Sequence, residues 1–415
     1  MADDGRNSDE LDKIMQQIQN LQVESSSSAD DRRRRHERSA IFHVNEKYRA
    51  YLDTFGGFIQ GYEFDCERGD AVGHRLVTVE CDPDTGEISH REATFLVLRR
   101  GESGRRDAVR MFEATCRLRG SVAIANAFLV ANCDGLKRWV ICYEKLAGIL
   151  SDYPDDHMLT TFGAFSSNGT DSLSPYWSNQ IKMIITTLSD MGIRNVSHGG
   201  MSNPESYALT ESLDIKLINM GKNENSRTYQ HDLADFGTFL CQTPYIGASK
   251  CTSWTGFHFL INSNAMSQRY LWADIVKGHP LFLDPPSKLR CYVNLFEWSE
   301  LIQISEKTAF CDACYKLMPD LTQKTLWGWI SCCPASVKIY LNQAYKGINI
   351  YEDIITFVKN MILHGRQELM NANGGRWSDA HFCHKIEQLF PGFMSVAYAL
   401  SKATRSDLNK LLGRA

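Results

Sequence analysis

The order of apolar and polar positions divides the chain into three stretches of different character. Residues 1–40 are polar, with the runs SSSSADD and RRRRHERS, and such a composition cannot bury enough apolar surface to offset chain entropy. Short runs rich in Val, Ile and Phe follow between residues 41 and 150. After Pro175 the apolar residues recur mainly with helical spacing. The pattern predicts a disordered tail, a small β-rich lobe and a larger helical lobe.

Four runs between residues 41 and 150 are predicted to be strands, and one stretch among them is predicted to be a helix. The runs are HRLVTVECD, ATFLVLRR, VAIANAFLVANC and RWVICYEKL, and the helical stretch RRDAVRMFEATCRLRG lies between the second and the third. Such runs, bounded by turn residues, are typical of an antiparallel sheet with one helix packed on it. The predicted fold class is therefore α+β.

Composition and charge favour a soluble protein with more than one folded domain. The chain has 415 residues, 43% of them hydrophobic, whereas a domain usually has about 100 to 200 residues. The formal net charge is −4, so no overall basic field gathers nucleic acid or anionic lipid, and RNA binding requires a local site. No apolar run reaches the roughly 20 residues that a bilayer span requires. We therefore expect no membrane contact.

The thirteen cysteines favour reduced thiols rather than a disulfide framework. Their number is odd, and no apolar signal segment follows the acidic start MADDGRNSDE, so we expect a cytoplasmic protein, with the nucleus as the alternative. Two groups of Cys and His lack the paired spacing of a zinc ribbon or finger, so we predict no metal site. These groups are Cys311, Cys314, Cys332 and Cys333, and His381, Cys383 and His384.

Residues 196–221, VSHGGMSNPESYALTESLDIKLINMG, resemble the catalytic loop and metal-binding turn of a protein kinase. A His follows a short β-like run, a Pro-Glu comes next, and an apolar strand ends in a turn closed by Gly221. In kinases one Asp orients the substrate hydroxyl, a Lys neutralises the transferred phosphoryl group, and an Asn and a second Asp hold magnesium. The corresponding positions here are Gly200, Ser202, Ser206 and Asn219.

Further matches extend the resemblance over residues 41–283. Arg99 stands where a kinase has its phosphate-pairing Lys, Glu113 stands where that Lys has its ion-pair partner, and Glu144 stands at the hinge. Asp232, in HDLADFG, is similar to the Asp that braces the kinase catalytic loop from below. The resemblance implies a bilobal protein-kinase-like fold.

The departures from the kinase pattern predict a pseudokinase. Without the catalytic Asp, and with Asn219 in place of the metal-binding Asp, phosphoryl transfer loses its positioning base and part of its cation clamp. ATP or ADP is still a candidate ligand of Arg99, Glu113 and Asn219. The alternative is that Arg99 and Glu113 form only a structural ion pair.

Residues 284–415 read as a second, all-helical unit that carries the candidate chemistry. The stretch WGWISCCPASVKIYLNQAYKGINIYEDIITFVKNMILH resembles the KEN ribonuclease domain that follows the kinase fold in the inositol-requiring unfolded-protein sensor and in ribonuclease L. A Tyr-Lys-Gly, an acidic helix start, a basic-Asn pair and a His occur in the family's order. The matching residues are Trp327, Tyr345, Asp353, Lys359, Asn360 and His364.

Metal-free RNA cleavage needs a base for the 2′-hydroxyl, an acid for the 5′-oxygen and a cation beside the phosphate. We assign His364 as the acid, because imidazole transfers protons readily near neutral pH. Tyr345 is the base or a hydrogen-bond partner of the nucleophile. Lys359 stabilises the phosphate charge and Asn360 orients it, provided that the stretch from Glu352 is helical, so that Asn360 and His364 share a face. The family has Arg where this chain has Lys359, and Arg offers a bidentate fork rather than a point charge.

The leading hypothesis is therefore a metal-free endoribonuclease that requires no cofactor and acts on RNA, with a degenerate kinase domain as a platform for dimerisation and nucleotide sensing. The resemblance implies a homodimer, or a heterodimer with related kinase–ribonuclease chains. The alternative is a catalytically silent adaptor that associates with such chains, in which His364 and Tyr345 are structural residues. The expected organisation is a tail over 1–40, a kinase-like domain over 41–283 and a KEN-type domain over 284–415.

Overall fold

A computed structural model shows a chain of the α+β class, as predicted from the sequence. The predicted tail over residues 1–40, as well as Trp327 and Tyr345, lies outside the described residues. For much of strands β1 to β5 only the backbone is described. The described residues are 58–68, 71–81, 88–133, 138–153, 173–221, 228–243, 246, 248, 251, 253–268, 271–321, 349–366, 371 and 378–414.

Contacts between residues divide the chain into two compact units. One comprises Met1–Tyr153 with Thr186–Asp232, and the other comprises Pro154–Ile185 with Leu233–Ala415. The second unit runs across residue 284, where the sequence places a domain boundary. That boundary stays a prediction.

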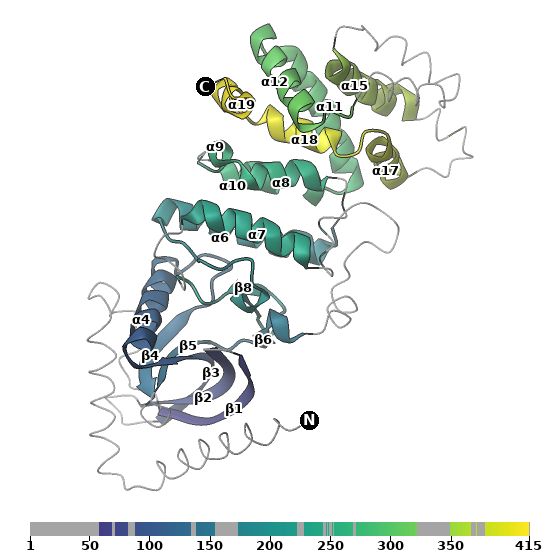
Figure 1. Ribbon diagram of the computed structural model, residues 1–415. Coiled ribbons are helices and arrows are strands. Elements are labelled where there is room, and N and C mark those ends of the chain that lie inside the picture. The colour runs from purple at the N-terminus through teal and green to yellow at the C-terminus, as the bar shows by residue number, and fades with distance from the viewer. Residues whose placement is uncertain are drawn as a thin grey trace, which may run out of the picture. The chain divides into compact units, whose positions relative to one another are not determined.

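The first unit is built on a five-stranded antiparallel sheet with the order β1-β2-β3-β5-β4 (Figure 1). Helix α4 (Gly101–Arg117) packs on β3, β4 and β5, as the sequence predicts, and buries Met111 and Phe112. Gly101 has a φ of 74°, which lets the chain pass from β3 directly into α4. The strands are β1 (Phe58–Arg68), β2 (Ala71–Cys81), β3 (Ile88–Arg100), β4 (Ala127–Cys133) and β5 (Arg138–Glu144).

Two strand predictions need correction. The edge strand β1 is absent from the four predicted runs, because FIQGYEFDCER contains Gly and three acidic residues and shows no clean alternation. The run from Val122 becomes a strand only at Ala127. Its first apolar residues are buried for another reason, since Ala123 and Ala125 exchange backbone hydrogen bonds with Leu217 at 2.7 and 3.1 Å.

A small three-stranded antiparallel sheet holds the loop that resembles a kinase catalytic loop. Its order is β6-β7-β8, and β7 and β8 follow that loop directly. Arg117 and Arg194 tie the ends of α4 and α6 together, because each guanidinium donates to the other residue's carbonyl oxygen at 2.6 Å. The elements are β6 (Gly148–Ile149), η1 (Leu150–Asp152), α6 (Pro175–Arg194), η2 (Pro204–Ser206), β7 (Tyr207–Leu209), β8 (Ile215–Leu217) and α7 (Tyr229–Gln242).

The second unit is a helical assembly around α18 (Phe393–Ser401). Every residue from Phe393 to Leu400 is buried, as expected for a helix that is apolar all round and lies in a core. Helices α8, α11 and α12 contact it. The helices are α8 (Trp254–Asn262), α9 (Asn264–Ser267), α10 (Trp272–Lys277), η4 (Pro280–Phe282), α11 (Pro285–Leu301), α12 (Ile304–Leu317), α15 (Ile350–Asn360), the π-helical turn η5 (Met361–Gly365), α17 (Asp379–Leu389) and α19 (Arg405–Leu412).

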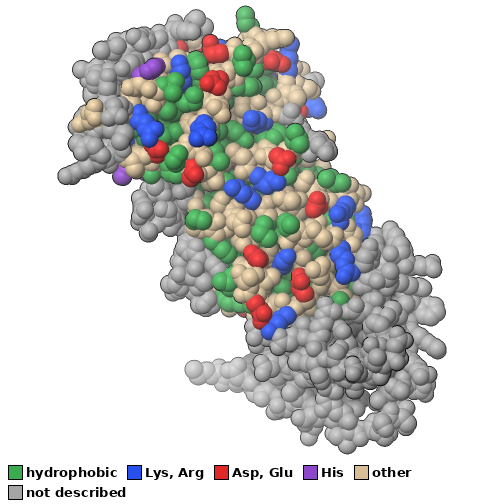
Figure 2. All heavy atoms as spheres, turned by 180° about the vertical axis from the view of Figure 1, so that it is seen from behind, with side chains coloured by type: hydrophobic (Ala, Val, Ile, Leu, Met, Phe, Trp, Pro, Cys, Tyr) green, Lys and Arg blue, Asp and Glu red, His purple; other side chains and the backbone are tan. Residues whose placement is uncertain are grey.

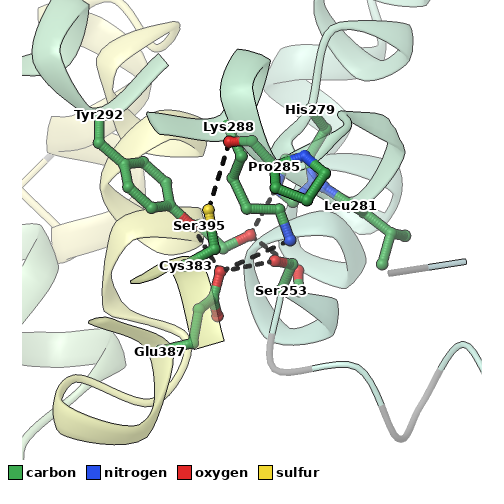
Figure 3. Close-up of polar contacts among 9 residues, drawn as sticks. All are labelled: Ser253, His279, Leu281, Pro285, Lys288, Tyr292, Cys383, Glu387 and Ser395. Atoms are coloured by element: carbon green, nitrogen blue, oxygen red, sulfur yellow. Dashed lines mark hydrogen bonds and ion pairs between the residues drawn. The ribbon is translucent and has the colours of Figure 1, made fainter. Parts of the chain in front are cut away.

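A buried polar cluster links α11 and α17 with the start of α8 (Figure 3). The Glu387 carboxylate, 2% exposed, accepts hydrogen bonds from Tyr292 Oη at 2.5 Å and Ser253 Oγ at 3.1 Å. The Lys288 ammonium lies 3.9 Å from the same carboxylate oxygen. A buried charge is tolerated only when it is paired and hydrogen-bonded. Helices α11 and α17 and the start of α8 must therefore pack so that these side chains meet. Burial raises the pKa of Tyr292 well above its usual range, so the phenol stays a donor.

A second branch of the cluster passes through Ser395 of α18. Its hydroxyl donates to the Ser253 carbonyl oxygen at 2.7 Å and lies 2.9 Å from His279 Nε2. His279 Nδ1 accepts from the Leu281 N–H at 3.2 Å, which leaves the ring proton on Nε2. Burial lowers the pKa of His279 to about 3, so the imidazole is neutral at physiological pH. Neutral imidazole can make both contacts at once.

Gly256 sets the close approach of α8 and α18. A Cβ at this position would lie 2.3 Å from the carbonyl carbon of Ser395 and 2.6 Å from the backbone N of Val396. We expect Gly256→Ala to lower the free energy of unfolding by about 3 kcal/mol, since backbone cannot yield as a side chain does. Urea denaturation measures this loss.

Gly365→Ala is the matched control, because its Cβ would meet only Met361 Cγ at 3.6 Å. Alanine is the better helix former, so this variant should be neutral or slightly stabilising. Equal losses in the two variants would contradict the close-approach argument.

Candidate functional site

Helix α15 and the π-helical turn that follows it carry the C-terminal candidate residues. The Asn349 side chain accepts from the Tyr351 N–H at 3.0 Å and caps the helix start. The stretch from Glu352 is helical, as the sequence predicts. Its apolar face packs on α11 and α12 and buries Tyr351, Ile354, Ile355, Phe357 and Val358.

Side-chain contacts fix the first half of α15. The Tyr351 ring stacks on Phe393 with centroids 6.0 Å apart, and its hydroxyl donates to the Met318 carbonyl oxygen at 3.4 Å. The Lys307 ammonium of α12 lies 3.1 Å from the Glu352 carboxylate. These contacts come from two other helices, so the position of α15 is set by the packing of the unit.

The helix does not end at Asn360 but continues through Met361–Gly365 as a π-helical turn. Backbone angles on either side are helical, with φ and ψ of −62° and −38° at Asn360 and of −59° and −52° at Arg366. π-Helical turns are rare, occur mostly inside α-helices and are frequent at functional sites. An ion pair between Arg366 and Asp379 anchors the far end of the turn to α17. One continuous helical segment therefore carries Lys359, Asn360 and His364.

Lys359 and Asn360 present uncommitted donors on this segment. Both side chains are partly exposed and His364 is exposed. The Lys359 ammonium lies 4.5 Å from the centre of the Phe296 ring, and no carboxylate of the described residues pairs with it. The Asn360 amide has no hydrogen-bond partner in the described part of the chain. The pair is thus a local cationic donor site on a protein with no overall basic charge.

Asp353 lies on the buried side of the same helix. It is 3% exposed, and its N–H donates to the Asn349 carbonyl oxygen at 3.0 Å within the first turn of α15. A carboxylate in a first turn is favoured by the helix dipole. The structure therefore places Asp353 away from the exposed surface on which His364 lies. The predicted roles of Trp327 and Tyr345 fall outside the described residues and stay predictions.

In the first unit, Asp232 braces the kinase-like loop, and this prediction is confirmed. Its carboxylate is fully buried and accepts from Ser197 Oγ at 2.8 Å, from the His198 N–H at 2.7 Å and from the Gly199 N–H at 2.8 Å. The His198 ring nitrogen Nε2 donates to the Ile218 carbonyl oxygen at 2.7 Å. The loop is therefore clamped from both sides.

Asn219 occupies the turn that resembles the metal-binding turn of kinases. Its φ is 62°, it is 5% exposed, and its amide Nδ2 donates to the Glu205 carbonyl oxygen at 3.2 Å. Within the described residues its Oδ1 atom has no hydrogen-bond partner. The acceptor is thus available to a cation or a donor from a ligand. Tyr143, which sequence reasoning missed, lies beside the backbone of Asn219, and burial raises the pKa of its phenol well above the usual range.

Of the predicted pair of Arg99 and Glu113, the structure describes the side chain of Glu113 only. Arg99 lies in β3, but its side chain is outside the described residues. Glu113 lies on α4 and is partly exposed. The hinge position Glu144 has a structural contact, since its carboxylate accepts from the Asn126 N–H at 3.0 Å. The ion pair between Arg99 and Glu113 stays a prediction.

Sequence reasoning also missed Phe296 and the cluster around Glu387. No local pattern marks them, because their partners lie on other helices. The two Cys and His groups for which the sequence predicts no metal site are partly described. Their described cysteines, Cys311, Cys314 and Cys383, are buried free thiols. Among the described residues, no group of three or more His, Cys, Asp and Glu side chains is placed to hold a metal ion.

No protein-family model matches the sequence, and a search of curated proteins gives no match. In the part of the chain that the structure describes, no helix combines the length and apolar character needed to cross a bilayer.

We expect Asp232→Ala to lower the free energy of unfolding by about 3 kcal/mol, because three buried donors lose their acceptor at once. Ser197→Ala is the graded control, since it removes one donor and leaves the carboxylate with two N–H partners. Its cost should be about 1 kcal/mol. Denaturant unfolding measures both, and a loss in Asp232→Ala no larger than in the control would argue against the clamp.

Proposed function

We propose that this chain is a metal-free endoribonuclease, with a KEN-type ribonuclease domain over 284–415 and a bilobal protein-kinase-like domain over 41–283. One observation carries the proposal: a single helical segment with a π-turn holds Lys359 and Asn360 one turn before an exposed His364. This arrangement joins an unneutralised cation, an amide donor and a proton-transfer group on one surface.

The reaction we propose is attack of the RNA 2′-hydroxyl on the adjacent phosphorus. The bond to the 5′-oxygen breaks, and the products are a 2′,3′-cyclic phosphate and a free 5′-hydroxyl. His364 donates a proton to the leaving 5′-oxygen. Tyr345 accepts the proton of the 2′-hydroxyl or hydrogen-bonds that oxygen. Lys359 and Asn360 donate to the phosphate oxygens as negative charge builds up on them.

The kinase-like domain serves as a platform in this proposal. The clamp of Asp232 on His198 and Gly199 supports it, because a buried carboxylate under the catalytic loop is a feature that the resemblance predicts. Gly200 carries no side chain where kinases have the catalytic Asp, so we do not assign phosphoryl transfer to this domain. ATP or ADP would be a regulatory ligand, and dimers, either homodimers or heterodimers with related chains, would assemble the site.

A second candidate function is favoured by Lys359, which stands where the resembled family has Arg, and by the missing catalytic Asp at Gly200. If the point charge of Lys cannot replace the guanidinium fork, RNA is not cut. The chain would then be a silent adaptor that associates with related kinase–ribonucleases. Cleavage of RNA by the purified protein separates the two functions.

We expect the purified protein to cleave a short stem-loop RNA in the presence of EDTA, at a rate that rises more than linearly with protein concentration. His364→Ala should lower kcat by about 10²- to 10⁴-fold, the usual contribution of a general acid. A fluorescent substrate at saturating concentration gives the rates.

His384→Ala is the matched control, because His384 is a partly exposed His of the same unit that lies on α17. It should cleave at the wild-type rate. No cleavage by folded wild-type protein at any concentration would reject the ribonuclease and favour the adaptor.

ATP with magnesium should raise the melting temperature of the protein if the kinase-like domain binds nucleotide. A ligand at a hundredfold excess over its Kd stabilises by about 2.7 kcal/mol. Asn219→Gly should abolish much of this shift, because Gly keeps the left-handed backbone and removes only the amide. Asn195→Gly, at an exposed Asn with a φ of 49°, is the control and should retain it. The same shift in both variants would remove Asn219 from the binding site.

A further inference from the structure

Phe296 lies beneath the only cation of the candidate ribonuclease site among the described residues. The residue is partly buried on α11, and the Lys359 ammonium of α15 lies 4.5 Å from its ring centre. The two helices pack directly on each other. Nothing in the local pattern of either helix predicts the contact, which depends on their packing.

The ring is held on a rigid part of the unit. Lys288, Tyr292 and Phe296 are four residues apart on α11 and therefore share one stripe of the helix. The first two are fixed by the buried Glu387 carboxylate (Figure 3). On the same helix Trp298 packs edge-on against Phe310 of α12, with centroids 5.1 Å apart. The helix that carries Phe296 is thus fixed by the core, and the Phe296 side chain packs against that core.

We propose that Phe296 is a positioning residue that holds the Lys359 ammonium where the scissile phosphate binds. This inference rests on the proposed ribonuclease function and adds a residue to it. A lysine ammonium is a point charge on a flexible four-carbon stem, whereas an arginine fork is planar and pre-organised. The aromatic face restricts the ammonium to one position and so supplies the order that the missing fork would otherwise provide.

A ring suits this task better than a carboxylate would. An ion pair would neutralise the ammonium and compete with the phosphate for it. Such a pair does occur on α15, where Glu352 lies 3.1 Å from the Lys307 ammonium of α12. The ring attracts the cation through its quadrupole and leaves the full charge, with donors that point away from the ring. Lys359 thus keeps its charge for an anion that is held in place by Asn360 and His364.

The test compares Phe296→Leu with Phe296→Tyr and Phe296→Trp. We expect the Leu variant to lower kcat about tenfold with little change in KM, since a small misplacement of a catalytic charge has effects of this order or larger. Tyr and Trp keep an aromatic face and should retain most of the wild-type kcat. In a Lys359→Met background the Leu substitution should have no further effect on kcat, because the group it positions is gone.

Trp298→Leu is the matched control on the same helix. This substitution removes an aromatic packing contact of α11 and leaves the contact between Lys359 and Phe296 in place. It should lower stability and leave kcat at the wild-type value. An equal loss of kcat in Trp298→Leu and Phe296→Leu would overturn the proposal, because α11 would then act only through its packing.

A second readout does not depend on RNA. In carbon–proton NMR spectra the ε-methylene protons of Lys359 should be shifted upfield by the Phe296 ring current, and the shift should disappear in Phe296→Leu. Cleavage that needs His364 but not Phe296 would overturn this inference alone. Absence of cleavage by the wild-type protein would overturn both the inference and the proposed function, whatever the NMR result.

Discussion

The buried carboxylate of Glu387 is the constraint on which the second unit depends. It accepts from Tyr292 and Ser253 and lies beside the Lys288 ammonium, so one charge joins three segments far apart in the sequence. Breaking such a buried pair costs about 3–5 kcal/mol, because the remaining charge is left without compensation. The cluster therefore specifies which helix faces meet, a task that apolar packing alone performs loosely.

The candidate site is a consequence of that arrangement. With α11 fixed, Phe296 presents its ring to α15, and the helix extends past Asn360 in a π-turn that ends at the ion pair between Arg366 and Asp379. The exposed charged side chains of both signs are mixed over the described residues on the face shown in Figure 2. Binding of an anion would therefore depend on a local donor group rather than on a long-range field.

The first unit uses the same device in its loop. Asp232 is a buried acceptor for three donors of one loop, and the His198 ring of that loop donates to the Ile218 carbonyl oxygen. The turn at Asn219 keeps an acceptor atom without a partner among the described residues, which is costly unless a ligand or water fills it. The loop backbone is thus held by buried hydrogen bonds at His198 and Gly199.

The pattern of residues predicts the α+β class, four of the five strands of the larger sheet, α4, the helix after Glu352 and the bracing contact of Asp232. The helices and strands follow from the spacing of apolar residues, whereas the contact of Asp232 is what the resemblance to kinases implies. The burial of Asp353, the contact of Lys359 with Phe296 and the π-turn are seen only in the folded chain. Periodicity shows which face of a helix is apolar. It does not show which residue of another helix a buried polar group will contact, and Tyr292 and Glu387 are 95 positions apart in the sequence. Such pairs form because a charge that is buried without a partner costs free energy, and this cost arises only when the helices pack together.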